Sequence, residues 1–97
     1  YMAALDRIDQ VSGRIYNIGG GPQNALSIWA EFGPLLSRLI GREIPVRYGD
    51  WRPGDQPVYI SDISLAQRDL AWQPQVSVYE GVERMVGWIR DHLDLFR

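Results

Sequence analysis

Glycine and proline divide this chain of 97 residues into short segments. They interrupt the sequence at Gly13, at residues 19–22, at Gly33-Pro34, at Gly41 and at Pro74. Glycine supplies the left-handed backbone with which helices often end, and a proline inside a helix costs about 3 kcal/mol. No apolar run between these breaks approaches the roughly 20 residues that a membrane span needs. The chain must therefore be built from several short elements.

Four segments carry the apolar spacing of helices, which has a period of about 3.6 residues. We expect helices over residues 2–10, from Ser27 to Ile40, from Asp62 to Leu70, and from Ser77 to Leu93. Ser27 and Asp62 are good N-cap residues, and Ser77 with Glu80 forms a capping box. Gly33-Pro34 is expected to kink or divide the second helix. The last helix is expected to bury one stripe, formed by Val78, Val82, Met85, Val86, Ile89 and Leu93.

Three short segments between the helices have the β-branched and aromatic residues of strands: 14–18, 44–48 and 58–60. Together with the helices they predict an α/β fold of about four helices and two to three short strands. Two or three strands do not make a self-sufficient parallel sheet. We therefore expect residues 1–97 to be one segment of a larger protein. The first residues already follow an apolar helical pattern without a cap, which favours the same interpretation.

The charge and the residue types present exclude several kinds of function. Ten Lys and Arg against twelve Asp and Glu give a net charge of −2, which argues against a nucleic-acid or anionic-membrane surface. There is no Cys, so disulfides and thiolate metal sites are excluded, and one His is a poor supply of zinc ligands. We expect a cytoplasmic protein that binds no metal, no nucleic acid and no membrane.

One loop carries side chains suited to a diphosphate, at Trp51-Arg52-Pro53-Gly54-Asp55. The Arg52 guanidinium is always charged, and its planar fork matches phosphate oxygens bidentately. Pro53 stiffens the loop, Gly54 lets the backbone turn tightly, and Asp55 can orient the guanidinium or accept a hydrogen bond from a ribose hydroxyl. From these five residues alone, the favoured interpretation is a surface turn closed by an Arg–Asp ion pair, which contributes under about 1 kcal/mol.

The Gly19-Gly20-Gly21 turn is a second candidate, because glycine-rich loops after strands can bind phosphate. It lacks the G-x-G-x-x-G spacing and the lysine of a P-loop, so a tight turn before the second helix is the favoured interpretation. Ser27 has no general base near it in the sequence, and His92 suits a structural place at the end of the last helix. We expect no catalytic residue in this chain.

The order of the motifs along the chain is more specific than any single motif. Tyr-Asn-Ile-Gly-Gly-Gly at 16–21 is followed by a helix from Ser27, Arg-Pro-Gly-Asp at 52–55, Ser-Asp-Ile-Ser-x-Ala at 61–66, and Leu-Ala-Trp-x-Pro at 70–74. This run resembles the NAD-dependent sugar-nucleotide epimerases and dehydratases, which are extended short-chain dehydrogenases of Rossmann type. The resemblance covers nearly the whole chain. Ala71 departs from it, because the family usually has Gly before Trp-x-Pro.

The resemblance implies roles for three residues. The Arg of the family's Arg-x-Gly-Asp loop contacts the substrate diphosphate, which assigns that role to Arg52. Asp55 would hold the ribose or orient the Arg, and Tyr59 would also contact the substrate. Residues 17–19 resemble the last strand end of the family's dinucleotide-binding sheet. The family's NAD loop and its Tyr-x-x-x-Lys pair are absent from residues 1–97, so NAD would be bound by an N-terminal domain and not by this chain.

The function implied is that of a C-terminal, substrate-binding segment. The parent protein would be an NAD-dependent nucleotide-sugar epimerase or dehydratase, most similar to the CDP-paratose (CDP-tyvelose) 2-epimerase-like members. Its partner would be a nucleoside diphosphate sugar, and we expect it to be a homo-oligomer. A UDP-glucose 4-epimerase-like or dTDP-sugar 4,6-dehydratase-like parent is the alternative within this class. An autonomous small binding module is the alternative outside it.

Overall fold

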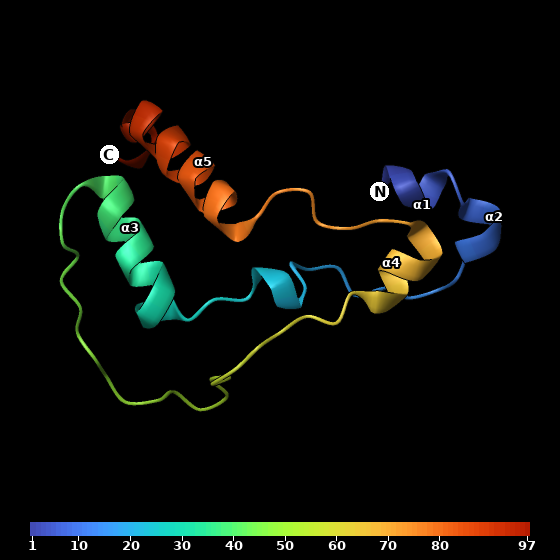
Figure 1. Cartoon of the computed structure of the whole chain (residues 1–97), viewed down its shortest axis with the longest axis horizontal. Coiled ribbons are helices and arrows are strands. Elements are labelled where there is room, and N and C mark those ends of the chain that lie inside the picture. Colours follow the sequence, from blue (N-terminus) through green and yellow to red (C-terminus); the bar gives the residue numbers. More distant parts are fainter. The chain divides into compact units, whose positions relative to one another are not determined.

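The computed structural model describes residues 1–97 and consists of helices joined by extended loops (Figure 1). In chain order the elements are α1 (Met2–Leu5), α2 (Ile8–Val11), η1 (Pro22–Asn24), η2 (Ile28–Phe32), α3 (Gly33–Ile40), α4 (Ser64–Leu70), α5 (Val78–Asp91) and η3 (Leu93–Phe96). η1 and η3 are short 3-10 helices, and η2 is one turn of π-helix. None of the helices combines the length and the apolarity that crossing a membrane requires.

The predicted α/β fold is wrong for this structure, because no residue is in a β-strand. The three segments expected as strands, 14–18, 44–48 and 58–60, are loops. A strand forms only when a neighbouring strand accepts and donates its backbone hydrogen bonds, and β-propensity mostly reflects packing against such neighbours. Large side chains of these segments are exposed instead, with Ile15 at 88%, Tyr48 at 78% and Val58 at 75%. These segments have strand-like residues but no strand partner.

The chain forms two compact units, each built from two stretches of sequence. Unit 1 comprises Tyr1–Ala25 and Tyr59–Gln75, and unit 2 comprises Leu26–Val58 and Val76–Arg97. Unit 1 therefore contains α1, α2, η1 and α4, whereas unit 2 contains η2, α3, α5 and η3. The predicted helix over residues 2–10 is divided into α1 and α2, which are separated by Asp6 and Arg7.

Unit 1 has a small apolar core between α2 and α4. Val11, Ala66 and Leu70 are buried there, and Ala66 has no exposed surface. Ala3, Ala4, Tyr16 and Trp72 pack against this cluster and are partly buried. The side chain of Arg7 donates a hydrogen bond of 3.0 Å to the Leu70 carbonyl oxygen, which satisfies one carbonyl of the last turn of α4.

In unit 2, α3 packs against α5, and Leu35 of α3 is buried. The predicted cap at Ser27 is confirmed: its Oγ accepts from Ala30 N at 3.4 Å, and its own N–H donates to Glu31 Oε2 at 2.7 Å. Gly33-Pro34 divides the predicted helix into η2 and α3, and Gly41 ends α3 with a positive φ of 80°. Such local signals fix where these helices begin and end.

The cap of α5 was also predicted correctly, whereas its burial was not. Ser77 Oγ accepts a hydrogen bond of 3.2 Å from Glu80 N, as expected of an N-cap. No residue of α5 is fully buried. Met85 is 63% exposed and Leu93, in η3, is 48% exposed. The apolar stripe is present in the sequence, but α3 covers too little of it to bury these side chains.

Candidate functional site

Arg52, Pro53, Gly54 and Asp55 form a tight turn. Asp55 N donates to the Arg52 carbonyl oxygen at 3.0 Å, and Gly54 has a φ of 86°. Proline at the second position and a glycine with positive φ at the third are the features of a type II turn. A Cβ at Gly54 would meet no atom within 4 Å, so glycine is needed here for its backbone conformation and not for close packing.

The Asp55 carboxylate holds Arg52 in this turn. Its Oδ2 accepts from the Arg52 backbone N at 2.9 Å and from Arg52 Nε at 3.4 Å. The Arg52 side chain is 85% exposed and that of Asp55 is 32% exposed. The terminal Nη1 and Nη2 of Arg52 have no hydrogen-bond partner in the chain. The arrangement presents a cation with a fixed base and free donors, which is suited to an anion such as a phosphate.

The other two residues predicted near a ligand are also exposed. Trp51 is 72% exposed beside the turn, so its indole is available for packing against a ligand. Tyr59 is likewise 72% exposed, but it belongs to unit 1, whereas Arg52 and Asp55 belong to unit 2. The structure thus brings Arg52 and Asp55 together in one turn and places Tyr59 on a separate unit.

In the Gly19–Gly21 turn, the N–H of Gly21 already has an acceptor within the chain. The Gly21 N–H donates to the hydroxyl of Ser61 at 2.9 Å, in a buried hydrogen bond. The Gly20 carbonyl oxygen accepts from Asn24 Nδ2 at 2.9 Å. Phosphate-binding loops keep their backbone N–H groups free for the ligand, and the N–H of Gly21 is not free, which favours a structural role for this turn.

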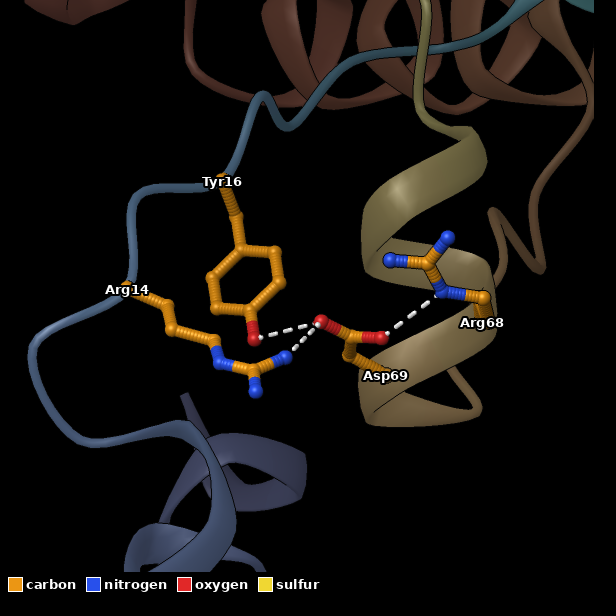
Figure 2. Close-up of polar contacts among 4 residues, drawn as sticks. All are labelled: Arg14, Tyr16, Arg68 and Asp69. Atoms are coloured by element: carbon orange, nitrogen blue, oxygen red, sulfur yellow. Dashed lines mark hydrogen bonds and ion pairs between the residues drawn. The ribbon is translucent and has the colours of Figure 1, made fainter.

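A cluster of charged residues that the sequence did not indicate lies in unit 1 (Figure 2). Asp69 of α4 is at its centre, with a side chain only 10% exposed. Its Oδ2 accepts from Arg14 Nη1 and from the Tyr16 hydroxyl, each at 3.0 Å. Its Oδ1 accepts from Arg68 Nε at 3.0 Å. Both oxygens of the carboxylate thus have partners within the chain, so its role is to hold the Arg14–Tyr16 segment against α4.

These contacts shift the pKa values of Asp69 and Tyr16. The hydrogen bond from Arg68 lowers the pKa of Asp69 most, and those from Tyr16 and Arg14 lower it further. Burial raises the pKa of Tyr16, and its hydrogen bond to Asp69 adds to this. The spacing of Arg14 and Tyr16 could place both on one side of an extended segment. Their acidic partner lies 55 and 53 residues away, so no local pattern reveals it.

We predict that this cluster makes stability depend on pH in the acid range. Because the pKa of Asp69 is lowered on folding, its contribution is complete above its unfolded pKa of about 3.9 and is lost as the pH falls below that value. Asp69→Asn should therefore reduce stability at neutral pH and flatten the loss of stability between about pH 4 and pH 2. Urea unfolding at several pH values measures this. If the free energy of unfolding of Asp69→Asn falls as steeply with pH as that of the wild type, Asp69 is not the source of the acid sensitivity. Asp62, whose pKa is lowered by hydrogen bonds from Ser64, would then be the remaining acid-sensitive group.

No grouping of His, Cys, Asp or Glu side chains could hold a metal ion.

No family model and no solved structure matches the chain. Curated proteins do match it. The chain is 36% identical over 83 residues to the UDP-glucuronate 4-epimerase of Thermodesulfobacterium geofontis (strain OPF15), an alignment that covers 86% of this chain and 25% of that protein.

Two further relatives carry related names. The CDP-paratose 2-epimerase of Salmonella typhi is 32% identical over 88 residues, which cover 91% of this chain and 26% of that protein. The dTDP-glucose 4,6-dehydratase of Streptomyces griseus is 35% identical over 81 residues, which cover 84% of this chain and 24% of that protein. This chain is homologous to part of the sugar-nucleotide epimerases and dehydratases.

The family predicted from the order of the motifs is thus confirmed, and its members are enzymes. The chain spans about a quarter of the length of these sugar-nucleotide epimerases and dehydratases. Their names differ in the nucleotide, in the sugar and in the carbon that reacts, so they do not distinguish a CDP-sugar 2-epimerase from a 4-epimerase or a dehydratase.

Proposed function

We propose that this chain is the C-terminal, substrate-binding segment of an NAD-dependent nucleotide-sugar epimerase or dehydratase, and that Arg52 binds the substrate diphosphate. The observation that carries the proposal is the Arg52–Asp55 turn. It fixes the base of an exposed guanidinium and leaves the two terminal nitrogens free. The homology to nucleotide-sugar enzymes supports a diphosphate as the anion.

The geometry of the turn favours binding of an anion over a purely structural ion pair. Only Nε of Arg52 faces Asp55, and the distance of 3.4 Å is long for a charge-assisted hydrogen bond. An exposed pair of this kind stabilises a fold by about 1 kcal/mol at most. The short bond of 2.9 Å from the Arg52 backbone N–H to Asp55 is the one that closes the turn. Asp55 therefore shapes the loop, and the guanidinium fork remains available for two phosphate oxygens.

Binding the diphosphate would serve catalysis elsewhere in the complete protein. The diphosphate is remote from the sugar carbon that reacts, so its binding energy positions the sugar without taking part in bond making. NAD would supply hydride chemistry in a domain outside this chain. Asp55 has a free oxygen, Oδ1, that could accept a hydrogen bond from the ribose, and the exposed Tyr59 is proposed as a further substrate contact.

We further propose a CDP-sugar as the substrate. Residues 19–27 and the loop 49–56 resemble those of CDP-paratose 2-epimerase-like members, and a CDP-paratose 2-epimerase is among the relatives. A UDP-sugar is the second candidate, because a UDP-glucuronate 4-epimerase is 36% identical to the chain. A dTDP-sugar follows from the relationship to a dTDP-glucose 4,6-dehydratase.

Calorimetric titration of the complete protein tests both the diphosphate contact and the preference for a CDP-sugar. CDP-, UDP- and dTDP-sugars are compared with CDP and with CMP. We expect CDP to bind about ten- to a hundredfold more tightly than CMP, because charged hydrogen bonds contribute about 1.5–3 kcal/mol each. We expect the CDP-sugar to bind most tightly of the three sugars. Equal affinity for CDP and CMP would contradict the role of Arg52, and a preference for another base would replace only the CDP assignment.

A further inference from the structure

Ser61 is the buried polar residue of the chain, and it joins two distant segments of unit 1. Its side chain accepts a hydrogen bond of 2.9 Å from the N–H of Gly21, which is 40 residues away. Ser61 is 8% exposed, so this bond is shielded from water. A buried backbone N–H that loses its acceptor pays the full cost of desolvation, which makes the bond costly to break.

Two glycines bring the Gly19–Gly21 turn into direct contact with the segment that carries Ser61. A Cβ on Gly19 would lie 2.5 Å from Ser61 Oγ and 2.7 Å from Ser61 Cβ. A Cβ on Gly21 would lie 2.9 Å from Ile63 Cδ1, and Gly21 has a φ of 73°. The distances to Ser61 leave no room for a side chain at Gly19, and the positive φ disfavours one at Gly21. The glycine motif thus serves close packing against residues 61–63.

The segment before Ser61 contains Tyr59 and lacks regular structure. Residues 58–60 are in neither helix nor strand, and Tyr59 is 72% exposed. After Ser61 the chain is ordered, because Ile63 is buried and Asp62 Oδ1 accepts from Ser64 N at 3.0 Å at the start of α4. Tyr59 is two residues before Ser61, so their Cα atoms are at most about 7 Å apart. Ser61 is therefore the nearest tertiary attachment of Tyr59 within unit 1.

We propose that Ser61 is a positioning residue, which holds Tyr59 in place for the nucleotide sugar by its hydrogen bond to Gly21. The inference rests on the proposed function, since it takes Tyr59 to be a substrate-binding residue. Without the anchor, residues 58–61 would sample more conformations in the free protein. Substrate binding would then have to order them, and the entropy lost would weaken the affinity.

The test uses the complete protein and measures kcat, KM for the nucleotide sugar and the affinity for NAD. Ser61→Ala should raise KM about three- to tenfold, which corresponds to one hydrogen bond, and leave kcat and NAD affinity within twofold. Ser61→Cys, which keeps a similar volume but a weak acceptor, should give an intermediate KM. It also serves as the second variant if Ser61→Ala does not fold.

A double-mutant cycle with Tyr59→Ala decides whether Ser61 acts through Tyr59. Residues that act as one unit give effects that do not add. Adding Ser61→Ala, or Ser61→Cys in its place, to Tyr59→Ala should therefore raise KM no further. Full additivity would overturn the inference, and so would an unchanged KM in Tyr59→Ala. A fall in kcat and NAD affinity at unchanged KM would also overturn it, because it would show a purely structural role.

Arg52→Ala, measured in parallel, distinguishes the proposed diphosphate contact from the proposed positioning role of Ser61. If Arg52→Ala weakens nucleotide-sugar binding while the cycle is additive, the diphosphate site stands and the positioning role of Ser61 fails. If Arg52→Ala leaves the affinity unchanged while the cycle shows coupling, Ser61 and Tyr59 act on the substrate but the proposed diphosphate contact is wrong.

Discussion

Replacing Arg52 by alanine in the complete protein should weaken binding of the nucleotide sugar by about ten- to a hundredfold and leave NAD binding intact. The substitution removes the exposed guanidinium, whose free nitrogens are the proposed phosphate donors. A charged hydrogen bond contributes about 1.5–3 kcal/mol, and 1.4 kcal/mol is a factor of ten in affinity. Stability should change little, because an exposed ion pair contributes at most about 1 kcal/mol.

Two variants make this experiment specific. Arg52→Lys keeps the charge but loses the planar fork, so it should give an intermediate affinity. Arg42→Ala removes an exposed arginine from the same unit and should leave the affinity within about twofold. Isothermal titration with the nucleotide sugar and with NAD measures all three. Equal losses for Arg52→Ala and Arg42→Ala would mean that general charge, and not this turn, attracts the substrate.

The turn itself could be predicted from sequence because all of its determinants are local. Pro53 and Gly54 determine the backbone conformation of the turn, and Asp55 accepts a hydrogen bond from an N–H only three residues away. The caps at Ser27 and Ser77 were predictable for the same reason, since each hydroxyl reaches a backbone N–H three residues on. Such features depend on spacing within one turn, which a sequence displays directly.

Features that depend on distant partners were predicted poorly. Residues 14–18 have the composition of a strand, but pairing needs a second strand that this chain does not provide. The apolar stripe of α5 shows which face prefers burial but not whether another element covers it. The bonds from Arg14 and Tyr16 to Asp69 and the bond from Gly21 to Ser61 join residues 40 or more positions apart, and no local pattern encodes them.

The core of unit 1 gives the second large effect. We expect Leu70→Ala to lower the free energy of unfolding by about 2–5 kcal/mol, because it removes a buried side chain and leaves a cavity. Leu70 is 6% exposed and packs with Val11 and Ala66, the other buried members of this small cluster. With so few buried side chains, neighbouring residues have little means of refilling the space.

Leu65→Ala is the matched control, because Leu65 lies in the same helix, α4, and is 39% exposed. Both changes alter helix propensity equally, so their difference isolates burial. Urea unfolding should show a lower midpoint for Leu70→Ala at an unchanged m-value, and a shift of under about 1 kcal/mol for Leu65→Ala. Similar losses for both would contradict the placement of the core.

Under conditions where Leu70→Ala remains folded, its affinity for the nucleotide sugar should match the wild type, because Arg52 is held by residues of its own turn. Arg52→Ala and Leu70→Ala should therefore be opposites: one loses affinity at constant stability, and the other loses stability at constant affinity.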